Sequence, residues 1–265
     1  MAGRLYMVVP VLNEAPNLPR LFEGLRAAPA ESTVLLVDDG STDGTADRAR
    51  ELAGDLDLVV LRHPVNEGPG RAFGTAFEHL APVLEDGDYV LTMEGDNTSR
   101  VELLERMLLR SEEGYDAVLA SPYLYGGGIL NTDPLRVLVS HVANAFVKEF
   151  LGIRGIMTVS SFYRLHRGSL IRRLQELYGP RIVERPGFEC MPEMLMKMVF
   201  TGSTISEVAM VLDTDMRIGA SRMKIGKTAL GYVSCWLRKG AWLERAGYQK
   251  EARSMVSSSS SSGLV

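Results

Sequence analysis

The chain has 265 residues, 46% of them hydrophobic and 23% charged, with 29 Lys and Arg against 33 Asp and Glu. This composition predicts a folded domain with a substantial core and excludes wholesale disorder, and the net charge of −4 argues against a protein built to hold nucleic acid. Cys190 and Cys235 lie far apart and do not cluster with the four His, which excludes zinc ribbons and disulfide scaffolds.

Short apolar runs alternate with stretches of helical spacing along the first 93 residues. Four β-branched or leucine-rich runs predict buried strands, at residues 5–9, 33–37, 56–61 and 89–93. We expect Pro10 to end the first strand. Three stretches predict helices, at residues 17–27, 42–53 (with Ser41 as N-cap) and 70–84. This alternation predicts an α/β fold with a Rossmann-like, doubly wound, mostly parallel sheet and helices on both faces.

A polar loop follows the carboxyl end of each predicted strand: PVLNE, DDGSTD, NEGPG and EGDNTS. In open α/β sheets this edge is where ligands bind. Asp38 and Asp39 are suited to accept hydrogen bonds from a nucleotide base, and the alternative is that they cap the next helix. The pair Glu94 and Asp96 can reach one divalent cation and a diphosphate. The glycines of EGPGRAFG do not fit a dinucleotide fingerprint, because the last is one position late.

The ordered motifs VVPVLNEAPNL, LLVDDGSTDGT, NEGPGRAFGTAF and LTMEGDNT resemble family 2 glycosyltransferases. The resemblance extends over roughly residues 5–225 and is greatest to the polyprenol-phosphate sugar synthases, the group of dolichol-phosphate mannose synthase. It implies a GT-A fold, a nucleotide-sugar donor (GDP-mannose or UDP-glucose), a polyprenyl phosphate acceptor, and Mg²⁺ or Mn²⁺ as cofactor.

The resemblance also assigns roles to individual residues. It places the nucleotide sugar at Pro10, Asn13, Glu14, Asp38, Asp39, Asn66, Gly68, Gly70, Arg71 and Glu94. It places the metal at Glu94 and Asp96, and catalytic roles at Asp96, Arg136 and Arg222. The acceptor is expected at Ser140, Asn144, Arg164, Arg217, Ser221 and Lys224.

The chain departs from the family pattern at several positions. Pro122 replaces the usual Arg of S-R-Y, and Thr158 replaces the acid of D-x-T. Arg222 replaces the Lys of Ser-Lys, which keeps the charge and adds a planar fork of donors. Thr98 stands where relatives often carry Gln.

The acceptor determines what the site must supply. A phosphate monoester is already an anion near neutral pH, so inverting transfer to it needs a metal and cations and no strong base. Transfer to a sugar or small-molecule hydroxyl would need an Asp or Glu base, for which Glu189 and Glu193 are the candidates. A third reading is a non-catalytic nucleotide-sugar-binding protein.

Residues 217–253 contain nine Lys or Arg and two Glu, which gives a local charge of +7 against −11 elsewhere. Within the GT-A reading we expect a transferase domain (1–225), a basic amphipathic helical segment (226–253) and a disordered Ser-rich tail (254–265). The helical segment either lies on an anionic membrane surface or packs on the domain or on a second subunit. No apolar run suits a signal peptide or a spanning helix, so we expect a cytoplasmic protein, at most peripheral on the cytoplasmic membrane face. The sequence does not predict the oligomeric state.

Overall fold

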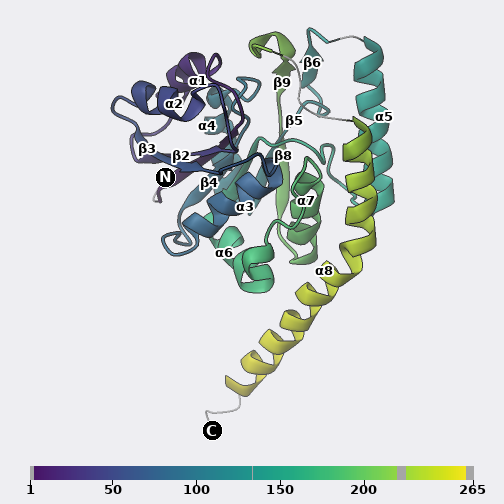
Figure 1. The fold of residues 1–265 in the computed structure, drawn as a ribbon. Helices are drawn as coiled ribbons and strands as arrows, with labels where there is room; N and C mark the ends of the chain where they lie inside the picture. The colour runs from purple at the N-terminus through teal and green to yellow at the C-terminus, as the bar shows by residue number, and fades with distance from the viewer. Residues whose placement is uncertain (1–2, 133, 220–224, 261–265) are drawn as a thin grey trace.

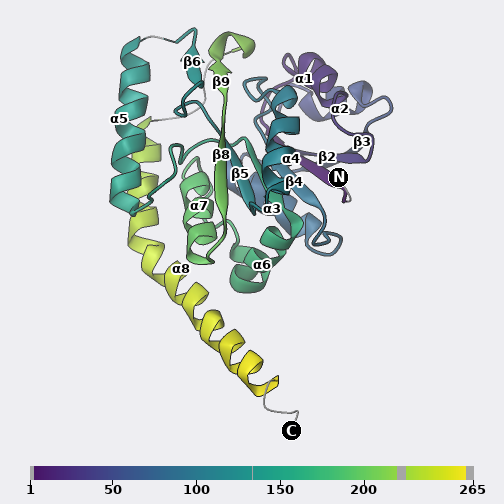
Figure 2. The same cartoon turned by 180° about the vertical axis from the view of Figure 1, so that it is seen from behind.

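The computed structural model describes residues 3–132, 134–219 and 225–260, which fold around a seven-stranded sheet of order β3-β2-β1-β4-β7-β5-β8 (Figures 1 and 2). Its strands are β1 (Leu5–Val11), β2 (Ser32–Asp38), β3 (Asp57–Arg62), β4 (Tyr89–Thr92), β5 (Ala117–Ser121), β7 (Arg164–Arg167) and β8 (Ile205–Ala209). Only β7 runs antiparallel to its neighbours among these strands. The expected doubly wound, mostly parallel sheet is confirmed.

Helices cover both faces of this sheet. They are α1 (Leu18–Leu25), α2 (Thr45–Leu52), α3 (Pro69–Leu80), α4 (Leu104–Glu112), α5 (Pro134–Leu151), α6 (Gly168–Tyr178), α7 (Cys190–Phe200) and α8 (Ile225–Ser260). Short 3₁₀ turns lie at η1 (Val101–Leu103), η2 (Gly179–Arg181) and η3 (Thr214–Met216). A second, two-stranded parallel sheet pairs β6 (Gly128–Leu130) with β9 (Val211–Asp213).

Alternation along β1 divides the core in two. Leu5, Met7 and Val9 face α1, α2 and α4, whereas Tyr6 and Val8 face α3, α6 and α7. Side chains on successive residues of a strand point to opposite faces, so a central strand between two helical layers must be apolar throughout. This arrangement explains why the strands predicted from continuous apolar runs are buried on both faces.

Pro10 lies inside β1, so the expectation that it ends the strand is wrong. Val8 and Pro10 direct their backbone groups to the same side, and Val8 O accepts from Met93 N at 3.1 Å. The pairing of β1 with β4 ends at Val8 and Thr92, so no strand lies beside Pro10 on this side. The sheet therefore loses no hydrogen bond because proline has no N–H. Pairing with β2 on the other side continues to Val11.

The second helix begins three residues later than expected, at Thr45, and Ser41 is not its N-cap. Ser41 Oγ instead accepts a hydrogen bond from Asn13 N at 2.8 Å, which joins two loops. Gly44, with φ of 82°, precedes the helix, and Asp43 Oδ1 accepts from Thr45 N at 3.0 Å. Neither Asp38 nor Asp39 therefore caps α2.

α8 is one continuous helix to Ser260, longer than the expected 226–253 and extending into the predicted tail. Both views show it running beside α5 and then away from the domain (Figures 1 and 2). Cys235, Trp242 and Ala246 are buried against the domain. Among the described residues, no helix is both long and apolar enough to span a bilayer.

A buried lysine connects α8 to α7. Lys197 Nζ lies 2.6 Å from Glu193 Oε1 and 3.7 Å from Glu184 Oε1, and it faces the rings of Tyr178 and Trp242 at 4.9 and 5.0 Å. Trp242 Nε1 donates to Glu184 Oε1 at 3.0 Å. Because Lys197 and Glu193 are fully buried, each requires the opposite charge of its partner.

Candidate active site

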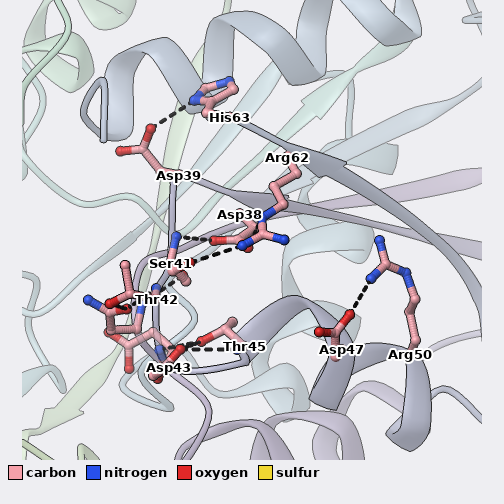
Figure 3. A network of polar contacts seen from close by, with 12 residues as sticks. Asp38, Asp39, Ser41, Thr42, Asp43, Thr45, Asp47, Arg50, Arg62 and His63 are labelled. Carbon is pink, nitrogen blue, oxygen red and sulfur yellow. Dashed lines mark hydrogen bonds and ion pairs between the residues drawn. The ribbon is translucent and has the colours of Figure 1, made fainter. Parts of the chain in front are cut away.

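The loops that follow β1 and β2 interlock at the carboxyl edge of the sheet. Asn13, with a left-handed φ of 47°, accepts from Thr42 N through Oδ1 at 2.7 Å, and its own N–H donates to Ser41. Glu14 N donates to Thr45 Oγ1 at 2.9 Å. The PVLNE and DDGSTD motifs thus form one hydrogen-bonded unit, of which Figure 3 shows the DDGSTD side.

Asp39 organises the third loop. Its Oδ1 accepts from Glu67 N at 2.9 Å and its Oδ2 from Gly68 N at 2.8 Å. His63 Nδ1 lies 2.8 Å from the same Oδ1, and His63 Nε2 lies 2.9 Å from Thr75 Oγ1 (Figure 3). Both carboxylate oxygens of Asp39 are therefore engaged within the chain.

Asp38 is the member of the pair with an oxygen to spare. It is fully buried, and its Oδ1 accepts from Ser41 N at 2.8 Å (Figure 3). Its Oδ2 accepts no hydrogen bond from the described residues, although Arg62 Nε lies 3.3 Å away. A buried carboxylate oxygen without a donor is suited to receive the N–H edge of a base.

The glycines of NEGPG are needed for a close backbone approach. A Cβ on Gly70 would lie 1.8 Å from Arg185 O, and Gly70 N donates to Pro186 O at 2.8 Å. Gly68 has a φ of 99° and would likewise meet Pro186 O. The loop before α7 therefore packs directly against the NEGPG loop, a contact that the sequence did not indicate.

The remaining residues predicted to bind the nucleotide sugar differ in whether their side chains already have partners. Asn66, the first residue of the NEGPG loop, is exposed. Arg71 pairs with Glu78 at 2.9 Å, so it must leave that partner to meet an anion. Arg62 was missed by sequence reasoning, because an arginine at the end of a strand is ordinary without knowledge of what faces it.

Glu94 and Asp96 form an acidic pair after β4. Burial raises the pKa of Glu94 to about 7, repulsion by Asp96 adds to the rise, and a hydrogen bond from Ser99 opposes it. Asp96 Oδ1 accepts from Thr98 Oγ1 at 2.6 Å. Asp96 Oδ2 accepts from Arg217 Nε at 2.5 Å, and Arg217 Nη2 contacts the same oxygen.

This acidic pair fits a divalent cation. Two hard carboxylates lie on one turn, and their repulsion is relieved by the charge of Arg217. Among the described residues, no group of three or more His, Cys, Asp or Glu could hold a metal. A cation here would therefore take its other ligands from a diphosphate and water.

Two of the predicted acceptor residues form hydrogen bonds with backbone groups of the chain. Arg164 is 1% exposed and donates to the backbone carbonyls of Ser161, Met191 and Val159 at 2.7, 2.9 and 2.9 Å. Asn144 donates to Met157 O and accepts from Val159 N. Both side chains therefore hold the turn before β7.

An acidic side chain from β8 binds the backbone of the same turn. Glu207 of β8 accepts from Met157 N at 2.6 Å and from Thr158 N at 2.8 Å. A carboxylate thus contacts the backbone of the residue that replaces the acid of the motif. No sequence pattern indicated this contact, because Glu207 lies 49 positions further along the chain.

The remaining predicted residues are not placed. Ser221, Arg222 and Lys224 lie outside the described residues, and the side chains of Arg136 and Ser140 on α5 are likewise not described. Arg217 is placed, and it lies on Asp96.

The mostly parallel sheet, with polar loops at one edge and an acidic pair after the fourth strand, has the GT-A fold of glycosyltransferases. The chain belongs to glycosyl transferase family 2, whose family model matches residues 6–174.

Two relatives match nearly the whole chain. The polyprenol monophosphomannose synthase of Mycolicibacterium smegmatis is 30% identical over 92% of this chain and 90% of its own length. The undecaprenyl-phosphate mannosyltransferase of Micrococcus luteus is 29% identical over 90% of this chain and 96% of its own. Among solved structures, glucosyl-3-phosphoglycerate synthase from Mycobacterium tuberculosis, bound to Mn²⁺, UDP-glucose and glycerol 3-phosphate, has a TM-score of 0.61 at 18% identity, covering 93% of this chain and 81% of that one.

Proposed function

We propose that this protein transfers a hexosyl group, with inversion, from a nucleotide sugar to the phosphate of a polyprenyl phosphate. The observation that supports it is the acidic pair with Arg217 at the donor edge, where cations and carboxylates gather without a free base. Both relatives are named for transfer of mannose to polyprenyl phosphates. A mannosyl donor such as GDP-mannose is therefore favoured over UDP-glucose.

The site suits a reaction between two anions. The acceptor phosphate has a second pKa of about 6, so its oxygen attacks the anomeric carbon without a strong base. Glu94 and Asp96 would hold Mg²⁺ or Mn²⁺, which stabilises the departing diphosphate. Asp38 would accept a hydrogen bond from the base through Oδ2. Arg217 would supply a positive charge near the diphosphate.

The geometry argues against a hydroxyl acceptor. Glu193 is fully buried and paired with Lys197, so it cannot remove a proton from a substrate. Glu189 is 8% exposed, and its carboxylate packs so closely on Gly231 that a Cβ there would lie 2.7 Å from Cδ. Neither candidate base is available. A purely binding role is disfavoured because the acidic pair is retained.

A transfer assay tests the proposal. Purified protein is supplied with labelled GDP-mannose or UDP-glucose, Mn²⁺ or Mg²⁺, and either polyprenyl phosphate or the corresponding polyprenol. Label should enter the lipid only with the phosphate acceptor and a divalent cation. Transfer to the polyprenol or to a water-soluble hydroxyl acceptor at a comparable rate would reject the proposal.

A lipid acceptor requires contact with a membrane, and we propose that α8 provides it from the cytoplasmic side. Leu230, Val233 and Leu237 are 74%, 44% and 70% exposed along the helix, while its other face packs on the domain. Arg238 and Lys239 follow directly. Exposed apolar residues beside basic ones are typical of helices that lie on an anionic surface.

The Leu230→Glu/Leu237→Glu variant is expected to bind anionic vesicles at least about tenfold more weakly, since burying each leucine contributes about 1.5–3 kcal/mol. Sedimentation with phosphatidylglycerol vesicles at low salt measures this. Leu109→Glu is the control, because Leu109 is 57% exposed on α4, which covers the opposite face of the sheet. Equal sedimentation of all three proteins would refute membrane contact through α8.

A further inference from the structure

Asn17 is a buried polar residue at the donor edge to which the family motifs assign no role. It is 2% exposed and directly precedes α1. Its carboxamide pairs with the backbone of Ile218: Ile218 N donates to Asn17 Oδ1 at 2.9 Å, and Asn17 Nδ2 donates to Ile218 O at 3.1 Å. One side chain thus satisfies both backbone groups of a residue 201 positions away.

Asn17 also joins the loops that contain the other site residues. Its Nδ2 donates to Glu14 Oε2 at 2.6 Å. Asn97 Nδ2, one residue after Asp96, donates to Asn17 O at 3.0 Å. The loops after β1 and β4 and the segment after β9 therefore meet at one buried carboxamide. Removing it would take these hydrogen bonds from the N–H and the C=O of Ile218.

The residue held beside Ile218 is Arg217. With the next residue fixed on both its N–H and its C=O, the Arg217 guanidinium is directed to Asp96 Oδ2. Asp96 Oδ1 is meanwhile engaged by Thr98 at 2.6 Å. Both oxygens of Asp96 are thus used within the chain, and a cationic side chain occupies Oδ2, one of the two oxygens that a metal could bind.

We propose that Asn17 is a positioning residue that holds Arg217 on Asp96, and that a divalent cation must displace Arg217 to bind the acidic pair. The inference rests on the proposed metal role of Glu94 and Asp96. Arg217 then neutralises the pair while no metal is bound. Once displaced, the planar guanidinium group of Arg217 can form paired hydrogen bonds with a phosphate group, whose geometry it matches.

Binding of Mn²⁺ alone to the full-length protein, followed by the electron paramagnetic resonance signal of free Mn²⁺, tests the inference without turnover. Arg217→Gln is expected to bind Mn²⁺ on the order of tenfold more tightly, because a positive charge a few ångströms from the ion is removed. Asn17→Ala should give a similar gain by releasing Arg217. The double variant should bind no more tightly than Arg217→Gln, since Asn17 acts only through Arg217.

Two further variants make the outcomes distinct. Arg100→Gln removes an exposed positive charge, from an arginine 3.6 Å from Glu102, and should change Mn²⁺ affinity much less. Asp96→Asn should abolish the binding. Mn²⁺ affinity unaffected by Asp96→Asn would refute the metal proposal itself. Two results would overturn the inference and leave the metal proposal standing, provided that Mn²⁺ binding depends on Asp96. In the first, Arg217→Gln does not raise Mn²⁺ affinity. In the second, Arg217→Gln raises it but folded Asn17→Ala does not.

Discussion

Asp96→Ala is expected to lower sugar transfer by about a thousandfold or more while the domain stays folded. The side chain interacts with Thr98 and Arg217 at the rim of the site and fills no part of the apolar core. A metal that stabilises a departing diphosphate supplies several kcal/mol, and about 4 kcal/mol corresponds to a thousandfold in rate. Steady-state transfer rates and thermal melting of the same preparations measure the two effects.

Glu67→Gln is the matched control for Asp96→Ala. Glu67 also has its carboxylate at this edge of the sheet, but the side chain is 41% exposed and lies 3.7 Å from Arg71. It should keep nearly full activity. If Asp96→Ala retained wild-type turnover, or if excess chelator had no effect on the wild type, the metal site would have to lie elsewhere.

Trp242→Ala should reduce the free energy of unfolding by about 3–5 kcal/mol, as large-to-small changes of buried aromatic residues do. For a chain of this size that corresponds to a fall in melting temperature of roughly 10 °C. Trp242 is 1% exposed, its carbonyl accepts from Tyr178 Oη at 3.0 Å, and its ring covers Lys197. The loss would open a cavity beside a buried ion pair.

The neighbouring Leu243 offers a control on the same helix, because it is 53% exposed. Leu243→Ala should change stability by no more than about 0.5 kcal/mol. Scanning calorimetry or thermal melts followed by circular dichroism distinguish the two variants. Equal melting temperatures for Trp242→Ala and the wild type would show that α8 is not integral to the domain, contrary to its packing here.

The first half of α8 packs on the domain through one face and leaves another face exposed. One face is part of the domain core through Cys235 and Trp242, and another exposes Leu230 and Leu237. A basic, amphipathic sequence is compatible with either arrangement, because periodicity gives the apolar positions but not what covers them. Docking and membrane contact therefore concern different faces of one helix.

The local sequence determined the parallel sheet and the position of the donor loops. Buried strands are apolar throughout, and the carboxyl ends of parallel strands lie at one edge, so DDGSTD and EGDNTS had to meet there. The family motifs follow the same local order, which is why the class of enzyme was predictable. The acidic pair was found for the same reason, since Glu94 and Asp96 are two residues apart.

Only the tertiary structure decided what each polar side chain does. Arg164 and Arg217 have the same chemistry, yet one donates to buried backbone carbonyls and the other lies on Asp96, 121 positions away in sequence. Asn17 accepts from the backbone of Ile218, and Glu207 accepts from the backbone of Thr158. Burial and hydrogen-bond partners depend on contacts between residues distant in the chain, and no local pattern encodes them.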